Sequence, residues 1–196
     1  MAHWYTADLH LGHDRIMRLC NRPFSDTEAM TTGLIERLQD TVAPEDDLWI
    51  VGDFTFGKNR DAALIRRWFD AIPGRKHLIV GNHDSDVVKA LPWASQHDLW
   101  HHVDRGMEVT LCHYPMVAFP RSGSGACQVF GHVHDLWPGT RNSVNVGVDL
   151  WDYRPVQIDA ILNRAAGLPY NAHFEAVEYG GTARVPPPPL TVPEAR

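Results

Sequence analysis

Aspartate, asparagine and histidine side chains recur in five short blocks along the first two-thirds of the chain. The blocks are Asp8-x-His10, Gly52-Asp53, Gly81-Asn82-His83-Asp84, Cys112-His113 and Gly131-His132-x-His134. Each block follows a short apolar run that is typical of a β-strand. Because ligands bind beyond the carboxyl ends of strands in open α/β sheets, we expect the blocks to meet at one edge.

Such a meeting would concentrate carboxylates and imidazoles, a combination that divalent cations stabilise. Clustered carboxylates repel one another, and clustered neutral imidazoles lack partners. The donors are oxygen and nitrogen without a thiolate, which suits Mn, Fe, Zn or Co. There are too many donors for one ordinary site, so two metal ions sharing a bridging carboxylate fit better. Gly52, Gly81 and Gly131 each precede a donor, where glycine allows a sharp turn and close backbone approach.

Apolar runs and turn residues predict the elements that would carry these blocks. A helix is expected from Asp26 to Val42, capped by Ser25 with Glu28 closing a capping box. A second helix, capped by Asn59, is expected to end at Pro73-Gly74. Strands are expected over residues 2–7, 47–51, 76–80, 107–112, 127–130, 143–148 and 155–158.

The order of these elements is βαβαβ followed mostly by β, which predicts a layered α/β or α+β domain. We expect this domain to span residues 1–165. Residues 166–196 are predicted to form a C-terminal extension, proline-rich from about Gly180 and partly disordered.

Composition narrows the range of functions. The chain has 196 residues and a net charge of −6, which disfavours broad affinity for the nucleic-acid backbone. The three cysteines, Cys20, Cys112 and Cys127, form no Cys-x-x-Cys motif, which favours a reducing compartment. No apolar run approaches the ~20 residues that span a membrane. A cytoplasmic location is the resulting expectation. Among the 12 histidines, His97, His101 and His102 follow no ligand spacing and are expected to be structural or exposed.

Taken in order, the five blocks resemble the motifs of the calcineurin-like metallophosphoesterase superfamily: D-x-H, G-D, G-N-H-[DE], a single H, and G-H-x-H. The segments Asp8-Leu-His-Leu-Gly-His13, Arg22-Pro-Phe and Asn145-Val-Gly-Val-Asp149 also resemble a small bacterial and phage branch of phosphoesterases. The resemblance implies a four-layer fold in which two mixed β-sheets form a sandwich flanked by helices.

The resemblance also implies a role for each donor. Metal ligands would be Asp8, His10, Asp53 and His134 for one ion, and Asp53, Asn82, His113 and His132 for the other. Asp53 would bridge the two ions, which are expected to be Mn, with Fe, Zn, Co or Ni as alternatives. A hydroxide between the ions would attack phosphorus, and His83 would protonate the leaving oxygen. Asp84 would orient His83 or cap a helix.

The substrate is less closely defined by the sequence. His13 and Arg22 are candidate phosphate contacts, with Arg15 and Arg60 as weaker ones. We expect a small, nucleotide-like phosphate ester, with a preference for diesters such as a 2′,3′-cyclic phosphate. We expect neither membrane association nor stable binding of nucleic acid, and the oligomeric state stays open. The alternatives are a DNA- or RNA-processing nuclease and a non-catalytic metal-binding scaffold.

Overall fold

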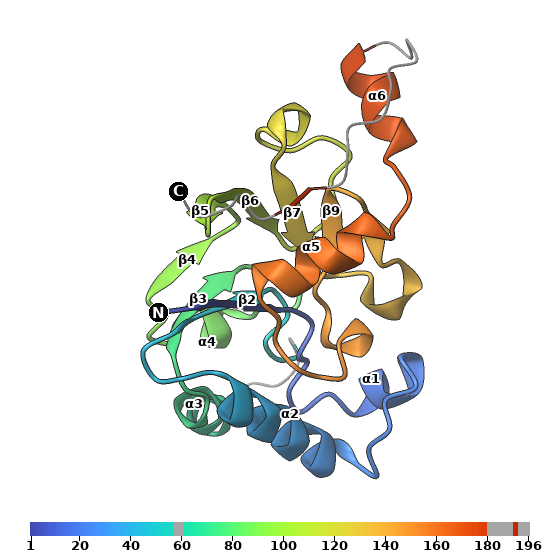
Figure 1. Ribbon diagram of the computed structural model, residues 1–196. Helices are drawn as coiled ribbons and strands as arrows, with labels where there is room; N and C mark the ends of the chain where they lie inside the picture. Colours follow the sequence, from blue (N-terminus) through green and yellow to red (C-terminus); the bar gives the residue numbers. More distant parts are fainter. Residues whose placement is uncertain (57–60, 180–189, 192–196) are drawn as a thin grey trace.

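The computed structural model contains two β-sheets with helices packed around them (Figure 1). It describes residues 1–56, 61–179 and 190–191. The first sheet has the strand order β1-β2-β3-β4, and all of its strands are parallel. These strands are β1 His3–Thr6, β2 Asp47–Val51, β3 Arg75–Ile79 and β4 Ser95–His97.

The second sheet is mixed and has the order β5-β6-β7-β9-β8. Strands β6, β7 and β9 are parallel neighbours, while β5 and β8 run antiparallel at the two edges. The strands are β5 Leu99–Asp104, β6 Met107–Cys112, β7 Cys127–Phe130, β8 Gly139–Thr140 and β9 Ser143–Asn145. The predicted class, an α/β sandwich of two sheets flanked by helices, is confirmed, although only the second sheet is mixed.

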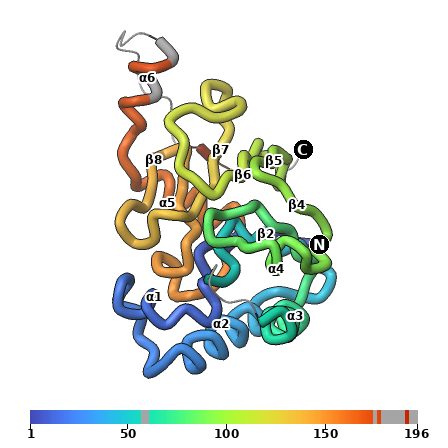
Figure 2. Tube along the Cα trace, turned by 180° about the vertical axis from the view of Figure 1, so that it is seen from behind, coloured from blue at the N-terminus to red at the C-terminus, as the bar shows by residue number. Residues whose placement is uncertain are grey.

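Helices α2 and α3 lie together on one side of the first sheet, and α6 projects from the other end of the molecule (Figures 1 and 2). The α-helices are α1 Asp14–Leu19, α2 Thr27–Thr41, α3 Ala62–Ala71, α4 Asp86–Lys89, α5 Ile158–Ala166 and α6 Ala172–Tyr179. Short 3-10 helices cover η1 Ser122–Ser124, η2 His134–Leu136 and η3 Val148–Leu150.

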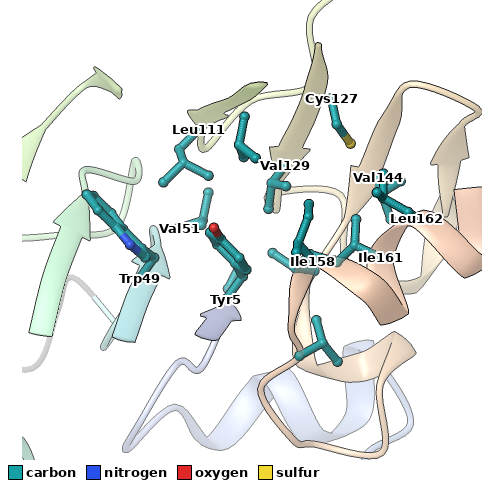
Figure 3. Close-up of a cluster of buried hydrophobic side chains, with 14 of the residues drawn as sticks. Tyr5, Trp49, Val51, Leu111, Cys127, Val129, Val144, Ile158, Ile161 and Leu162 are labelled. Atoms are coloured by element: carbon teal, nitrogen blue, oxygen red, sulfur yellow. The ribbon is translucent and has the colours of Figure 1, made fainter. Parts of the chain in front are cut away.

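Strand β2 shows how the core is divided between the two faces of the first sheet. All five of its residues are buried. Leu48 and Ile50 pack with the apolar faces of α2 and α3. Trp49 and Val51 point the other way and pack with β6, β7 and α5 (Figure 3). A strand buried on both faces is typical of a parallel sheet covered on both sides.

Both predicted helices are present, but their caps differ from the prediction. Helix α2 is capped by Asp26, whose side chain accepts a hydrogen bond from the Ala29 N–H, so Ser25 is not the cap. Helix α3 is capped by Asp61, and Asn59 lies outside the described residues. Aspartate fills both positions because its carboxylate accepts a backbone hydrogen bond and favours the positive end of the helix.

The predicted strand over residues 155–158 is wrong. Only Val156 pairs, through an isolated antiparallel bridge with Tyr5, and Ile158 already begins α5. The expected strand over residues 143–148 is shorter, because β9 ends at Asn145. Short apolar segments do not distinguish a strand from the first turn of a buried helix.

The C-terminal part contains α6, while residues 180–189 and 192–196, including the proline run, lie outside the described residues. The predicted boundary at residue 165 and the predicted disorder of the tail therefore stay predictions. Among the helices that the structure describes, none combines the length and the apolar character that crossing a bilayer requires.

A group of polar side chains, which we call the inter-sheet cluster, is held between the two sheets near the start of β1 and β2. The Tyr5 hydroxyl donates to Asp104 Oδ2 at 2.8 Å and lies 3.2 Å from His102 Nε2. Trp49 Nε1 donates to His3 Nδ1 at 3.2 Å. The other members are Asp47, Arg75 and His77, and the Asp47 carboxylate bonds to both Arg75 and His77.

Candidate metal centre

The five predicted blocks follow the carboxyl ends of β1, β2, β3, β6 and β7, and the structure brings their side chains together. We call the seven predicted ligands the strand-end cluster. Asp53 lies at its middle. Asp53 Oδ2 is 3.5 Å from His10 Nε2 and 3.5 Å from His113 Nε2. One carboxylate oxygen therefore faces imidazoles from two different blocks.

Asn82 joins the two sheets across this edge. Its side-chain oxygen is 3.1 Å from His113 Nε2 and 2.9 Å from His132 Nδ1. His113 Nδ1 in turn lies 2.9 Å from the Val51 carbonyl oxygen, which fixes the orientation of the ring. An amide oxygen and two imidazole nitrogens consequently point toward one region next to Asp53.

Asp8 organises the other side of the cluster. Both of its carboxylate oxygens accept from the His132 backbone N–H, at 3.0 and 2.9 Å. Ligand atoms of Asp8, His10 and His134 lie within 4.8 Å of one another, and those of Asp8, Asp53 and His113 do so as well. These two groups of donors share Asp8, and a third group, Cys20, His134 and Asp149, meets the first at His134.

His10 lacks the partners that a buried imidazole normally has. It is 1% exposed, and neither of its ring nitrogens has a hydrogen-bond partner among the described residues. Buried polar groups are nearly always paired, so an orphaned ring needs an explanation. A metal ion bound at Nε2, the nitrogen that faces Asp53, would supply one.

The backbone of the cluster is held in an unusual conformation. Five of the seven predicted ligands have positive φ, between 49° and 72°: Asp8, His10, Asp53, His132 and His134. Left-handed backbone is disfavoured for residues other than glycine, and such strain gathers at functional sites. The left-handed conformation turns the backbone sharply after each strand and directs the ligand side chains toward a common point.

Glycine makes close approach possible, as predicted. A Cβ at Gly81 would lie 2.3 Å from Asp53 Oδ1, and one at Gly131 would lie 2.7 Å from Asp8 Oδ2. At Gly52, which has φ +89°, a Cβ would lie 2.1 Å from His113 Nδ1. No other residue fits these three positions without moving a predicted ligand.

Electrostatics favours the metal-binding protonation state at some predicted ligands and opposes it at others. Although burial acts in the opposite direction, the hydrogen bond to Asp149 raises the pKa of His134 to about 10, and the contact with Asp53 raises the pKa of His113. Burial lowers the pKa of His10 to about 2, although the nearby Asp53 carboxylate acts in the opposite direction. Burial alone would raise the pKa of Asp53, but its contact with His113 and the charges around it lower the pKa to about 2. Burial raises the pKa of Asp8 to about 6, which leaves its ionised form in need of a cation.

These observations fit a site for divalent cations. Nitrogen and oxygen donors converge, a buried ring is unpaired, and glycines leave room for the ligands. Neutral imidazole and ionised carboxylate are the forms that coordinate metal. The residues that could hold metal ions are Asp8, His10, Asp53, Asn82, His113, His132 and His134.

His83 lies beside the strand-end cluster and is not one of its seven predicted ligands. Its ring centroid is 5.4 Å from that of His10 and 5.5 Å from that of Phe56, and the residue is half-buried. Its backbone N–H donates to Asp53 Oδ1 at 2.8 Å. A partly exposed imidazole at this place can contact a molecule bound at the cluster, as the predicted role of a proton donor requires.

Asp84 does not orient His83 as predicted. Its carboxylate accepts from the backbone N–H groups of Gly81, Asp53 and Phe54, at 2.8, 3.0 and 2.9 Å. Asp84 therefore holds the turn that contains Asp53, and its role is structural positioning of a ligand.

His13 lies close to the cluster, consistent with the predicted contact to substrate, which stays a prediction. Its ring stacks on Phe56 at 3.7 Å and lies 5.4 Å from the His10 ring. Its Nδ1 is buried without a hydrogen-bond partner among the described residues. Burial lowers the pKa of His13 to about 4, so the ring is neutral at physiological pH.

Arg22 is not placed to contact a substrate. Its side chain has no exposed surface and forms an ion pair with Asp149, with Nε 2.7 Å from Oδ1. Its two remaining nitrogens donate to the carbonyl oxygens of Asp8 and Leu9. The guanidinium is thus used inside the protein, and the prediction that it binds phosphate is wrong. Arg15 is exposed, and Arg60 lies outside the described residues.

Three residues near the site are absent from the predicted site residues: Asp149, Asn145 and Cys20, the last with its ligand atom within 4.8 Å of those of His134 and Asp149. Asp149 Oδ2 lies 3.1 Å from His134 Nδ1. The Asn145 amide donates to the carbonyl oxygens of His134 and Trp137 and accepts from Gly147 N–H. Asp149 and Asn145 both lie in the Asn145-Val-Gly-Val-Asp149 segment, whose pattern was a signal, although composition alone could not reveal these contacts.

Comparison with known proteins finds distant relatives. No family model matches the chain. It is 28% identical over 180 residues to the gene 66 protein of Mycobacterium phage L5, covering 76% of this chain and 86% of the phage protein. It is 29% identical over 165 residues to an uncharacterized protein of Methanocaldococcus jannaschii, covering 80% of this chain and 86% of the archaeal protein.

Among solved structures, a protein of unknown function from Aquifex aeolicus superposes with a TM-score of 0.64 and 26% identity, covering 79% of this chain and 94% of that protein. A phosphoesterase from E. coli superposes with a TM-score of 0.48 and 16% identity, covering 75% of this chain and 78% of that protein. The first likeness supports the architecture. The second is too weak to carry a conclusion, so the function has to be inferred from the site.

Proposed function

We propose that this chain is a dinuclear metal-dependent phosphoesterase with a preference for phosphodiesters. The observation that carries the proposal is the position of Asp53, whose Oδ2 lies 3.5 Å from ring nitrogens of both His10 and His113. The proposed ligands are those predicted from the sequence, with Asp53 shared between two ions. We favour Mn, and the oxygen and nitrogen donors suit Fe, Zn or Co as alternatives.

Divalent cations held by these residues would lower the pKa of bound water toward neutrality and would neutralise charge on phosphoryl oxygens. The protein's own contribution is to position and to transfer a proton. The left-handed loops hold the donors in place before substrate binds, which avoids reorganisation during the reaction. His83 Nε2 or Nδ1 donates a proton to the ester oxygen as its bond to phosphorus breaks.

The preference for diesters remains an expectation from the sequence, because the proton donor His83 would assist the alkoxide leaving group of a monoester as well. An alkoxide leaving group needs a proton, and an imidazole next to the cluster can supply it. A small nucleotide-like substrate, such as a 2′,3′-cyclic phosphate, agrees with the net charge of −6, which disfavours a long nucleic-acid track.

The test is a substrate screen on protein that has been stripped with a chelator and reloaded with Mn²⁺. Bis-p-nitrophenyl phosphate, p-nitrophenyl phosphate, 2′,3′-cyclic nucleotides and DNA or RNA strands are compared at one pH and one salt concentration. We expect metal-dependent hydrolysis, faster for small diesters than for monoesters. Cleavage of long strands with steep salt dependence would instead identify a nuclease. Loaded protein that hydrolyses none of these compounds would identify a metal-binding scaffold.

A further inference from the structure

Two buried charged side chains that are distant in the sequence, Arg22 and Asp149, meet beneath the strand-end cluster. Nε of Arg22 lies 2.7 Å from Oδ1 of Asp149, and Nη2 lies 3.0 Å from Oδ2. Their side chains are 0% and 1% exposed. A buried ion pair loses the hydration of both charges, so it is a weak source of stability. The other contacts of Arg22 and Asp149 therefore indicate the role of the pair.

Asp149 contacts a predicted ligand. Its Oδ2 lies 3.1 Å from Nδ1 of His134. With Nδ1 engaged, Nε2 is the nitrogen that remains to bind a metal ion. A carboxylate on the far nitrogen of a histidine ligand fixes its tautomer and ring orientation. His134 itself has positive φ, so its backbone alone does not secure the ring in a relaxed conformation.

Arg22 contacts the loop that carries two more predicted ligands. Its Nη2 donates to the Asp8 carbonyl oxygen at 2.7 Å, and its Nη1 donates to the Leu9 carbonyl oxygen at 3.0 Å. Asp8 and His10 both have left-handed backbone here. A single guanidinium therefore ties this loop to the carboxylate that holds His134.

We propose that Arg22 and Asp149 are positioning residues, which fix the Asp8–His10 loop and His134 in one geometry for the first metal ion. The inference rests on the proposed function only in requiring that these donors bind metal. Arg22 and Asp149 touch neither substrate nor reacting atoms.

The chain contains a matched control for this arrangement. In the inter-sheet cluster, Arg75 binds Asp47 in the same bidentate way, at 2.5 and 2.7 Å. The same carboxylate, 5% exposed, lies 2.8 Å from His77 Nε2. This second Arg–Asp–His group lies at the opposite ends of the strands, far from the predicted ligands, and its loss should affect folding alone.

The experiment compares Asp149→Asn with Asp47→Asn in the full chain. Each protein is stripped with a chelator and titrated with Co²⁺, and both the binding isotherm and the visible absorption spectrum are recorded. For Asp149→Asn we expect one of two ions to bind about 10–100-fold more weakly, with an altered Co²⁺ spectrum. For Asp47→Asn we expect a lower Tm with unchanged Co²⁺ affinity and spectrum. Wild-type binding by folded Asp149→Asn would overturn the inference.

A second variant covers the case in which Asp149→Asn fails to fold, since it leaves the Arg22 guanidinium buried and unpaired. The double variant Arg22→Met, Asp149→Leu removes both charges together. We expect it to fold and to show the same weakened ion. If it folds and binds both ions like the wild type, the inference is wrong. Wild-type protein that binds two ions but hydrolyses no ester contradicts the proposed function and leaves the positioning roles standing.

Discussion

The strand-end cluster and the inter-sheet cluster are both rich in histidine and aspartate, yet they differ in how their polar groups are satisfied. In the inter-sheet cluster the polar side chains bond to one another, as Asp47 does with Arg75 and His77. In the strand-end cluster both ring nitrogens of His10 lack a hydrogen-bond partner among the described residues. A buried ring without such partners beside a carboxylate therefore distinguishes the strand-end cluster and favours a ligand there.

The backbone separates the two clusters in the same way. Five predicted ligands have positive φ, whereas His3, Asp47, His77 and His102, all in described segments, do not. Strands place the inter-sheet residues at no conformational cost. The strand-end residues stand in tight turns, and that strain persists because neighbouring groups such as Asp84 hold the turns in place.

One substitution in each cluster tests most directly whether the two clusters differ in function. Asp47→Asn alters the first residue of β2, and Asp53→Asn alters a residue just beyond the end of the same strand. Asp53→Asn should reduce turnover by more than the ~100-fold typical of losing a supporting residue, because both ions lose a shared ligand. Asp47→Asn should leave turnover unchanged and lower the free energy of unfolding by about 1–3 kcal/mol. Steady-state rates and denaturant unfolding measure the two effects, and equal loss of turnover in both variants would remove the distinction.

A second substitution separates proton transfer from metal binding within the strand-end cluster. His83→Ala should keep both ions and slow hydrolysis by about 10²–10⁴-fold. The loss should be greatest for esters with poor leaving groups, which depend most on the proton. Rates across leaving groups of different pKa, together with metal content, measure this. Loss of the ions from His83→Ala would show that His83 is a ligand, contrary to the assigned role.

Glycine offers a test of close packing at the cluster. A Cβ at Gly81 would lie 2.3 Å from Asp53 Oδ1, whereas one at Gly167 would have its nearest neighbour at 3.6 Å. Gly81→Ala should displace Asp53 and lower both Mn²⁺ affinity and the free energy of unfolding, the latter by about 1–3 kcal/mol. Gly167→Ala should leave affinity unchanged and stability within about 1 kcal/mol of the wild type. Calorimetric titration and thermal unfolding give both quantities, and normal Mn²⁺ binding by Gly81→Ala would contradict the packing argument.

The inter-sheet cluster should make the free energy of unfolding depend on pH. Burial lowers the pKa of His102 from its usual 6.5 to about 4, with contributions from His3, His101 and His77 and an opposing one from Asp47. The unfolded chain therefore binds more protons than the folded one between these values, and stability falls as pH falls from 6.5 toward 4.

His102→Gln removes this titration while keeping a donor for the Tyr5 hydroxyl. Relative to the variant, the wild type should lose about 1–3 kcal/mol of unfolding free energy between pH 6.5 and 4, since one pKa unit is about 1.4 kcal/mol. Denaturant unfolding at several pH values measures the difference. Parallel stability curves for the two proteins would show that folding does not lower the pKa of His102.

The sequence predicted which side chains meet at the sheet edge because a strand, a glycine and a polar residue recur together in it, and their role as metal ligands stays a prediction. Asp53 follows Gly52 after the apolar run of β2, and this local pattern was sufficient to predict its place at the sheet edge. Contacts between distant segments were beyond such reasoning. Nothing local indicates that Arg22 meets Asp149, 127 positions away, so a buried ion pair was mistaken for a phosphate contact.

Helix caps and short apolar segments were the parts of the fold that the sequence did not predict correctly. Ser25 and Asp26 are both good caps, and only the hydrogen bond from Ala29 N–H decides between them. The apolar residues Val156 and Ile158 suit either a strand or the start of a helix. In the structure two backbone hydrogen bonds join Val156 to Tyr5 in an isolated bridge, and Ile158 begins α5. Local patterns established the class of fold, while tertiary contacts set the boundaries of its elements.

The most direct measurement of the central claim is an anomalous-scattering map from crystals of the wild-type chain grown with Mn²⁺. The account predicts two Mn²⁺ peaks in the strand-end cluster, both within bonding distance of Asp53, and none near His3, Asp47 or His77. A peak in the inter-sheet cluster, or a strand-end cluster without Mn²⁺, would contradict it.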